Sequence, residues 1–153
     1  MQIIIEGADG SGKSTFAKLL SEKFGFPIVH RDKPKNEQEK KQMFDMYLSE
    51  AKKGSNAIYD RYMYSEQVYG PIMRDASFIN IEQMYEVEVE LAKTGAIVIF
   101  CDHKITTLWE ACLDRGETYI KDIGTLYDIQ SAYRMLFFDL NHLIPILQYR
   151  RQI

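Results

Sequence analysis

The feature that most constrains this chain is a glycine-rich segment close to its start. Residues 7–14 read Gly-Ala-Asp-Gly-Ser-Gly-Lys-Ser and fit the pattern G-x-x-x-x-G-K-[ST]. The apolar run Ile3–Ile5 precedes the segment, and a helical pattern follows from about Ser14 to Phe24. Such a strand–loop–helix unit points backbone N–H groups inward at the positive end of a helix, where they bind phosphate. The segment therefore predicts a phosphate-binding loop.

Each fixed residue of this loop has an expected role in binding ATP with Mg²⁺. Lys13 is placed to reach the β- and γ-phosphates, and the Ser14 hydroxyl is placed to bind Mg²⁺. The expected ATP-binding residues are those of the whole loop: Gly7, Asp9, Gly10, Ser11, Gly12, Lys13, Ser14 and Thr15.

The rest of the chain alternates short apolar runs with longer amphipathic segments. The expected strands are residues 3–5, 27–30, 57–60, 96–101 and 143–149. The expected helices are residues 14–24, 42–53, 62–69, 81–93, 106–113 and 123–140, with the charged stretch 33–41 as a solvated connection and a break at Gly70-Pro71. This alternation predicts an α/β fold in three layers, with a parallel sheet of about five strands flanked by helices. The length of 153 residues predicts a single domain over residues 1–153.

Composition narrows the class of protein further. The net charge of −3 argues against a general nucleic-acid-binding protein, which would usually carry a basic stripe. The sequence contains no apolar stretch long enough to span a membrane and no basic leader, so we expect a cytoplasmic protein without a membrane partner. Cys101 and Cys112 lack metal-ligand spacing and are expected to be reduced and buried.

A second informative segment, Tyr59-Asp60-Arg61-Tyr62, lies where a predicted strand ends. Ligands of such sheets bind beyond the carboxyl ends of the strands. We expect Asp60 to face Mg²⁺ and Arg61 to hold an anionic acceptor, because a guanidinium makes paired bonds to phosphate. Asp102, at the end of another apolar strand, is the alternative carboxylate for Mg²⁺.

The absence of a guanine-binding N-K-x-D segment argues against a GTPase, and the short chain argues against a motor ATPase. A kinase of a small metabolite is favoured. Residues 6–15, Glu-Gly-Ala-Asp-Gly-Ser-Gly-Lys-Ser-Thr, resemble the E-G-x-D-G-x-G-K-[ST]-T loop of thymidylate kinases. Asp60-Arg61-Tyr62 with Ser65 and Tyr69 resembles that family's D-R-Y-x-x-S-x-x-x-Y segment, and Arg115-Gly116-Glu117 resembles its lid.

This resemblance implies roles for individual residues. Asp9 would bind the 3′-hydroxyl of a deoxynucleotide, and Arg61 would hold its 5′-phosphate. Tyr69 would favour deoxyribose. The other implied acceptor-binding residues are Arg31, Ser65 and Glu66, with Glu66 facing the base. Arg115 would act as a lid arginine beside the catalytic residues Lys13, Asp60 and Arg61, and the family resemblance implies a homodimer.

The chain also departs from that family. It is much shorter, and the family's usual phosphate-binding arginine before Asp60 is not evident. The lid region offers Arg115 and Lys121 instead of several arginines. Glu66 occupies a position where an amide or a small residue is common, which leaves the base open. Such a compact form would suit a phage-encoded enzyme.

The predicted reaction is transfer of the γ-phosphoryl group of ATP to a deoxynucleoside 5′-monophosphate, dTMP or a related one, with Mg²⁺ as cofactor. The first alternative is a deoxynucleoside kinase, in which Asp32 would be the base that activates a 5′-hydroxyl. The second alternative is a regulator that binds nucleotide without catalysis. Phe44 and Tyr47 could stack on the acceptor base or pack in the core.

Overall fold

The computed structural model describes residues 1–31, 34–74, 76–116 and 119–150. Within these ranges, five strands form one parallel sheet in the order β2-β3-β1-β4-β5. The strands are β1 (Gln2–Glu6), β2 (Ile28–His30), β3 (Ala57–Asp60), β4 (Ile97–Cys101) and β5 (Ile146–Tyr149). The predicted α/β fold with a five-stranded parallel sheet is therefore confirmed, although β5 is shorter than residues 143–149.

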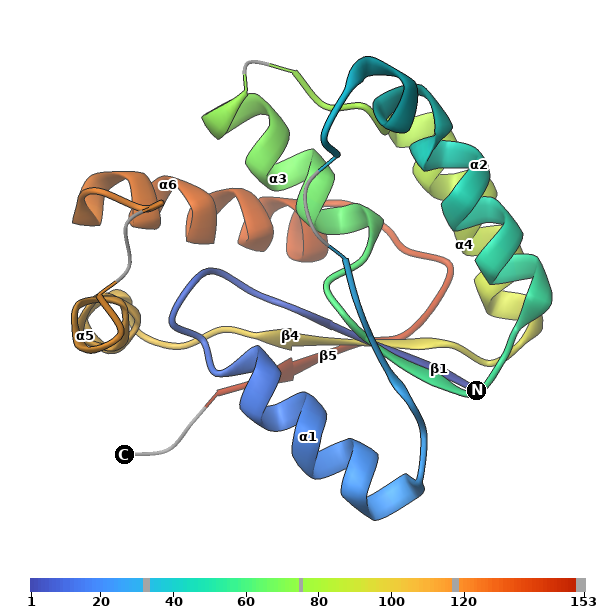
Figure 1. The fold of residues 1–153 in the computed structure, drawn as a ribbon, viewed down its shortest axis with the longest axis horizontal. Coiled ribbons are helices and arrows are strands. Elements are labelled where there is room, and N and C mark those ends of the chain that lie inside the picture. Colours follow the sequence, from blue (N-terminus) through green and yellow to red (C-terminus); the bar gives the residue numbers. More distant parts are fainter. Residues whose placement is uncertain (32–33, 75, 117–118, 151–153) are drawn as a thin grey trace.

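The helices lie on both faces of the sheet. They are α1 (Lys13–Phe24), α2 (Glu37–Lys53), α3 (Met63–Met73), α4 (Ile81–Lys93), α5 (Ile105–Asp114), α6 (Ile123–Arg134) and the π-helical turn η1 (Met135–Asp139). Figure 1 shows α1 on one side of the sheet, and α2, α3, α4 and α6 on the other. In the described part of the chain, none of these helices is long and apolar enough to cross a membrane.

Alternating residues of the central strand β1 pack into two separate hydrophobic cores, one on each face of the sheet. Ile3 and Ile5 pack with Ala17 of α1, whereas Ile4 belongs to the larger core beneath α3, α4 and α6. This is the period-two alternation of a strand that is covered on both faces. Cys101 and Cys112 are free and buried, as predicted.

Two predicted helix boundaries are wrong. Helix α2 begins at Glu37, inside the stretch that was expected to be a solvated connection, because the Asn36 side chain accepts a hydrogen bond from the Glu39 N–H at 2.8 Å and caps the helix. Helix α3 continues through Gly70 and Pro71 to Met73. Gly70 is needed there for packing, since a Cβ atom would lie 2.5 Å from the Ala76 carbonyl oxygen.

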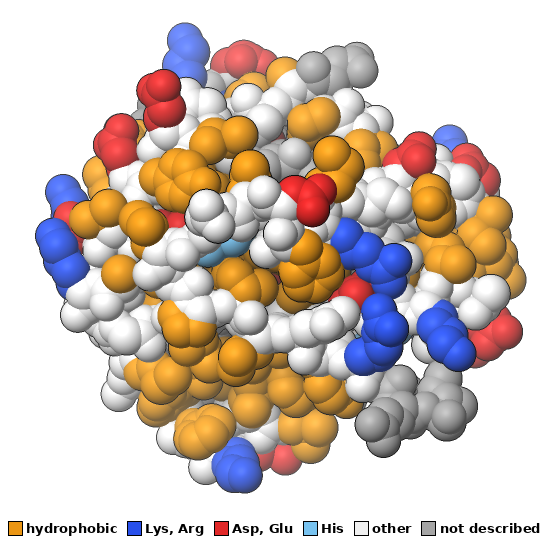
Figure 2. Space-filling model, turned by 180° about the vertical axis from the view of Figure 1, so that it is seen from behind, with side chains coloured by type: hydrophobic (Ala, Val, Ile, Leu, Met, Phe, Trp, Pro, Cys, Tyr) orange, Lys and Arg blue, Asp and Glu red, His pale blue; other side chains and the backbone are white. Residues whose placement is uncertain are grey.

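The predicted helix over residues 123–140 also ends early. Its α-helical part stops at Arg134, and the wider π-helical turn η1 follows. Phe137 in this turn packs against Phe100 of β4, with ring centroids 5.2 Å apart. Several apolar side chains near this turn remain exposed, including Met135, Phe138 and Leu143. Figure 2 shows hydrophobic side chains over much of the face opposite to that of Figure 1. The homodimer implied by the family resemblance stays a prediction.

Candidate active site

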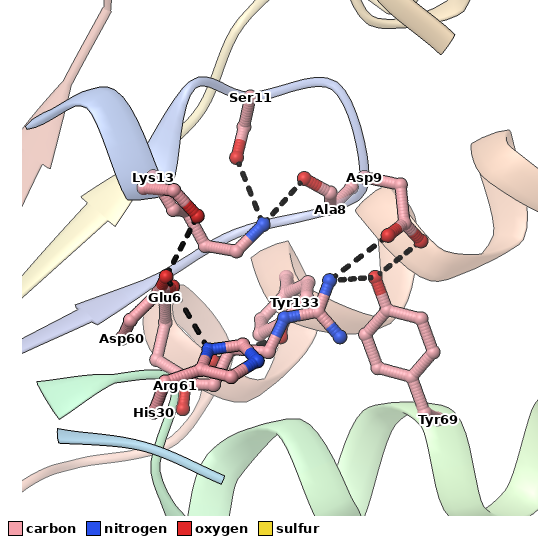
Figure 3. Close-up of polar contacts among 11 residues, drawn as sticks. Glu6, Ala8, Asp9, Ser11, Lys13, His30, Asp60, Arg61, Tyr69 and Tyr133 are labelled. Atoms are coloured by element: carbon pink, nitrogen blue, oxygen red, sulfur yellow. Dashed lines mark hydrogen bonds and ion pairs between the residues drawn. The ribbon is translucent and has the colours of Figure 1, made fainter. Parts of the chain in front are cut away.

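The glycine-rich loop connects β1 to α1 and curls around the ammonium group of Lys13. Lys13 Nζ donates to the Ala8 carbonyl oxygen at 3.0 Å and contacts Ser11 Oγ at 3.3 Å (Figure 3). Gly10 has a φ of 81°, and a Cβ atom there would lie 2.3 Å from the Leu108 carbonyl oxygen. Only glycine fits this position, which is fixed in the E-G-x-D-G-x-G-K-[ST]-T pattern but free in the general G-x-x-x-x-G-K-[ST] pattern.

The charge of Lys13 is finely balanced. Burial, followed by the nearby guanidinium of Arg61, lowers the pKa of Lys13 to about 8, while the carboxylates of Asp9 and Asp60 act in the opposite direction. At neutral pH the amine is still mostly protonated. An anionic phosphate is the ligand that would favour this charge most strongly.

The two residues predicted to bind the metal ion lie side by side. Asp60 is buried at the end of β3, and its Oδ2 atom accepts a hydrogen bond from Ser14 Oγ at 2.7 Å. His30 Nδ1 lies 3.5 Å from the same oxygen. Mg²⁺ usually binds through one or two protein oxygens, with water and phosphate completing its octahedron. The Ser14 hydroxyl and the Asp60 carboxylate therefore fit Mg²⁺. Among the described residues, no group of three or more His, Cys, Asp or Glu side chains could hold a metal ion without water or phosphate.

The alternative carboxylate, Asp102, is fully engaged by protein groups. Its Oδ1 atom accepts from Arg134 at 2.8 Å and from Gln130 at 3.2 Å. Its Oδ2 atom accepts from Gln148 at 2.7 Å and from Arg150 at 3.1 Å. These bonds occupy its lone pairs, so Asp60 is the better candidate for the Mg²⁺ side of the site.

The second predicted cluster brings together Asp9, Arg61 and Tyr69. The Arg61 guanidinium donates to Asp9 Oδ1 at 3.0 Å and to the Tyr69 hydroxyl at 3.1 Å. The Tyr69 hydroxyl in turn donates to Asp9 Oδ2 at 2.8 Å (Figure 3). Burial alone would raise the pKa of Asp9, but Arg61 and Lys13 hold it below its usual range. Asp9 of the phosphate loop thus forms one polar group with Arg61 and Tyr69, which lie more than fifty residues further along the chain.

The backbone of Arg61 is unusual, because its φ of 74° makes it the one non-glycine residue with a positive φ in the described part of the chain. Its N–H donates to the Ile5 carbonyl oxygen at 2.9 Å, which ties the turn to β1. Backbone strain of this kind is concentrated at functional sites.

Glu6 supports this turn from below, a role that the sequence analysis did not assign. Its carboxylate accepts from the Tyr62 N–H at 2.7 Å and from the Tyr133 hydroxyl at 2.9 Å. Burial raises the pKa of Glu6 to about 7, although these hydrogen bonds oppose the shift. A charged residue at the end of an otherwise apolar strand was the signal in the sequence.

A pocket opens next to the cluster. It contains the predicted acceptor-binding residues Arg31, Arg61, Ser65, Glu66 and Tyr69, and it is completed by Pro34, Met43, Tyr47, Tyr62, Arg74 and Tyr119. Arg31 is also ion-paired with Glu50 of α2. Tyr47 is buried and lines the pocket, so it serves both the core and the cavity, whereas Phe44 only packs against the core.

Arg74 is the functional candidate that sequence reasoning missed. Its Nη2 atom donates to Glu66 Oε2 at 2.6 Å, and both side chains line the pocket. Burial raises the pKa of Glu66 above its usual range, and Arg74 opposes that shift. The sequence analysis did not predict this pair because it expected the helix to break at Gly70-Pro71. Arg74 reaches Glu66 only because α3 continues for about two turns after Glu66.

The lid residues are the part of the prediction that the structure does not bring together. Arg115 is exposed at the end of α5, and Lys121 is exposed before α6. In the described ranges neither one lines the pocket. Asp32 and Glu117 lie outside the described residues.

Comparison with known proteins finds relatives at low sequence identity, two of which are kinases of nucleotides or nucleosides. No family model matches the chain. An uncharacterized protein, YorR, from the SPbeta prophage of Bacillus subtilis is 27% identical over 129 aligned residues, covering 83% of this chain and 78% of YorR. Deoxyguanosine kinase from Bacillus subtilis is 25% identical over 170 aligned residues, covering 95% of this chain and 82% of the relative. Thymidylate kinase from Leptospira borgpetersenii is 32% identical over 97 aligned residues, covering 44% of this chain and 47% of the relative.

Solved structures share the fold. The crystal structure of YorR in complex with phosphorylated GDP superposes with a TM-score of 0.80 at 24% identity, covering 99% of this chain and 85% of that one. Deoxyadenosine kinase from M. mycoides with bound dCTP gives a TM-score of 0.65 at 20% identity, covering 98% of this chain and 90% of that one. Together with the phosphate loop, these comparisons make the chain similar, at low identity, to P-loop nucleotide and deoxynucleoside kinases.

Proposed function

We propose that the protein transfers the γ-phosphoryl group of ATP to a deoxynucleoside 5′-monophosphate and releases ADP and the deoxynucleoside diphosphate. The observation that carries this proposal is the cluster of Asp9, Arg61 and Tyr69 beside Lys13. A guanidinium that is preorganised next to the phosphate loop suits an acceptor that is itself a phosphate. A ligand that is only held, and not phosphorylated, would not need this second anion-binding group.

The reaction requires little covalent chemistry from the protein. An oxygen of the acceptor phosphate attacks the γ-phosphorus, and the bond to the bridging oxygen of ADP breaks. Lys13 and the loop N–H groups would hold the β- and γ-phosphates, and Arg61 would hold the acceptor phosphate. Mg²⁺, held by Ser14 and Asp60, would neutralise charge on the phosphates. Arg115 is proposed to approach from the lid side.

The sugar is the next part of the acceptor to be recognised. Asp9 presents carboxylate oxygens to a 3′-hydroxyl, and Tyr69 packs its ring under Arg61, with the guanidinium carbon 4.6 Å from the ring centroid. The family resemblance assigns the Tyr69 ring to the 2′ side of the sugar, so we propose that it favours a deoxyribose acceptor.

A deoxynucleoside kinase is the second candidate. It is favoured by the deoxyguanosine kinase relative, which aligns over nearly the whole chain, whereas the thymidylate kinase aligns over less than half of it. In that reaction the acceptor is a neutral 5′-hydroxyl, and Asp32 would be the base. The monophosphate acceptor is the better-supported proposal, because the Arg61 guanidinium lines the acceptor pocket and suits a charged phosphate better than a neutral hydroxyl.

The test is an ATP-consumption assay with Mg²⁺, run against each deoxynucleoside monophosphate and each deoxynucleoside. The proposal expects turnover with monophosphates, reduced more than about a hundredfold in Lys13→Ala and in Arg61→Ala. Lys18→Ala, which changes an exposed lysine on α1, should retain full activity and serves as the matched control. Turnover with nucleosides alone would establish the second candidate, and ATP binding without turnover would indicate a regulator.

A further inference from the structure

One wall of the pocket is formed by the ion pair of Glu66 and Arg74. Glu66 is only 4% exposed and yet lines the cavity, with Arg74 at 2.6 Å. A buried ion pair is costly unless further hydrogen bonds satisfy its polar atoms. The groups that remain unsatisfied therefore indicate what the cavity can bind.

The pair has unused hydrogen-bonding capacity. Oε2 of Glu66 accepts from Arg74, and Oε1 accepts from the Phe78 N–H at a long 3.3 Å. A carboxylate offers about four lone-pair positions, so each oxygen retains one for a ligand. Arg74 also lines the pocket, and its guanidinium carries further N–H groups besides the one that it donates to Glu66. The wall thus offers two adjacent acceptors and one neighbouring donor.

Among the four bases, the Watson–Crick edge of guanine alone matches this pattern. It carries two adjacent donors, N1–H and the 2-amino group, next to the acceptor O6. Thymine presents a single N3–H between two carbonyl oxygens, which a carboxylate would repel. Adenine and cytosine each place a ring-nitrogen acceptor beside their amino group, and this acceptor would face one of the carboxylate oxygens.

We propose that Glu66 and Arg74 select guanine as the base of the acceptor, with Glu66 accepting from N1–H and the 2-amino group and Arg74 donating to O6. This inference rests on the proposed function, because it concerns the acceptor pocket of that reaction. It narrows the acceptor, which the sequence left open as dTMP or a related monophosphate, to dGMP.

The first test compares ligands with the unaltered protein. Binding of dGMP, dAMP, dCMP and dTMP is measured by calorimetry without ATP, alongside dIMP, which lacks only the 2-amino group of dGMP. We expect dGMP to bind at least about tenfold more tightly than dTMP, and dIMP to be weakened relative to dGMP by about tenfold, in line with the discrimination of paired base contacts. Equal affinities for the four bases, a preference for dTMP, or no binding of any of them would overturn the inference.

The second test removes one partner of the pair. Glu66→Gln replaces one acceptor by a donor that opposes a donor of guanine, so we expect dGMP affinity to fall about tenfold to a hundredfold. Affinity for dTMP should change much less. Glu86→Gln, an exposed glutamate on α4, is the matched control and should behave like the unaltered protein. A uniform loss for all bases in Glu66→Gln would show a structural role for Glu66 and overturn the inference.

These readouts separate the inference from the reaction itself. If dGMP binds selectively through Glu66 but no acceptor is phosphorylated, the proposed function fails and the base assignment survives. If monophosphates are phosphorylated with equal kcat/KM for all four bases, the reaction stands and the base assignment fails.

Discussion

Two aspartates, Asp60 and Asp102, lie at the ends of the two strands that flank β1 and have opposite roles. Asp60 ends β3 and Asp102 directly follows β4, and both strands pair with β1. Both carboxylates are buried. Among the described residues, Asp60 accepts one hydrogen bond, from Ser14, and has His30 at 3.5 Å. Asp102 accepts from four side chains.

The difference teaches which carboxylate is available to a ligand. Two of the groups that donate to Asp102 belong to α6 and its end, and two belong to β5 and the residue after it, so Asp102 ties the last third of the chain to the sheet. Asp60 retains acceptor capacity next to the phosphate loop. A buried carboxylate with spare lone pairs is a site for a cation, and a saturated one is a structural anchor.

The largest effect is expected for Asp60→Asn. The amide oxygen can still accept from Ser14, but the negative charge is lost, so kcat/KM for phosphoryl transfer should fall about a hundredfold to a thousandfold. Stability should change by no more than about 1 kcal/mol. Steady-state kinetics and urea unfolding check both values, and a fully active variant would remove Asp60 from the mechanism.

Asp102→Asn should give the reverse result. The amide cannot satisfy two guanidinium groups and two side-chain amides, so we expect a loss of about 2–3 kcal/mol in the free energy of unfolding. The loss stays small because the Arg134 and Arg150 side chains are 41% and 53% exposed, so water screens both ion pairs. Well below the unfolding temperature, kcat should be unchanged. A large loss of kcat with normal stability would reverse the assignment of the two aspartates.

A pH dependence is expected for nucleotide binding at the open end of the sheet. Since the pKa of Lys13 is about 8, its charge is lost as the pH rises through that value. The affinity for ATP should then fall by up to about tenfold per pH unit above it. Dissociation constants at about pH 7 and about pH 9 check this, and the slope should vanish in Lys13→Ala. A pH-independent affinity in the unaltered protein would contradict the assigned role of Lys13.

The smallest effect concerns a second buried carboxylate that is held by protein donors, Glu88. It accepts from the Tyr64 hydroxyl at 2.7 Å and from His142 Nδ1 at 2.6 Å, while His142 Nε2 lies 2.7 Å from the Leu136 carbonyl oxygen. Burial would lower the pKa of His142, but these two hydrogen bonds raise it above its usual value. Because the folded-state pKa is raised, protonation stabilises the fold at low pH, and this contribution is lost as the pH rises through that pKa.

Urea unfolding at about pH 6 and about pH 8.5 checks this contribution. The drop in unfolding free energy between the two conditions should be about 1 kcal/mol larger in the unaltered protein than in His142→Gln. Identical pH dependence in the two proteins would mean that His142 is not protonated in the folded state.

The sheet and the phosphate loop were predictable because strong local signals specify them. The apolar run Ile3–Ile5 predicted a buried strand, and the structure has one there. The glycines and Lys13 predicted a curled phosphate-binding loop, and in the structure the loop curls around the lysine ammonium group. The family resemblance implied the grouping of Asp9, Arg61 and Tyr69. For Arg61 the sheet geometry indicated the same place, since ligands bind beyond the carboxyl ends of parallel strands.

The rest depended on packing that no local pattern carries. Gly70 and Pro71 predict a break, but close packing of Gly70 on Ala76 keeps α3 helical, and only this continuation brings Arg74 to Glu66. The four donors of Asp102 come from residues 130–150 and required the order of β4 and β5. Asp102 therefore looked equivalent to Asp60 in the sequence.

The most direct test of the account is chromatographic measurement of ADP and dGDP formed from ATP, Mg²⁺ and dGMP by the unaltered protein, Asp60→Asn and Asp102→Asn. The account predicts equal amounts of ADP and dGDP from the unaltered protein, nearly the same rate from folded Asp102→Asn, and almost no product from Asp60→Asn. ATP that is bound without any diphosphate product in the unaltered protein, or product formation that survives in Asp60→Asn and disappears in Asp102→Asn, would contradict it.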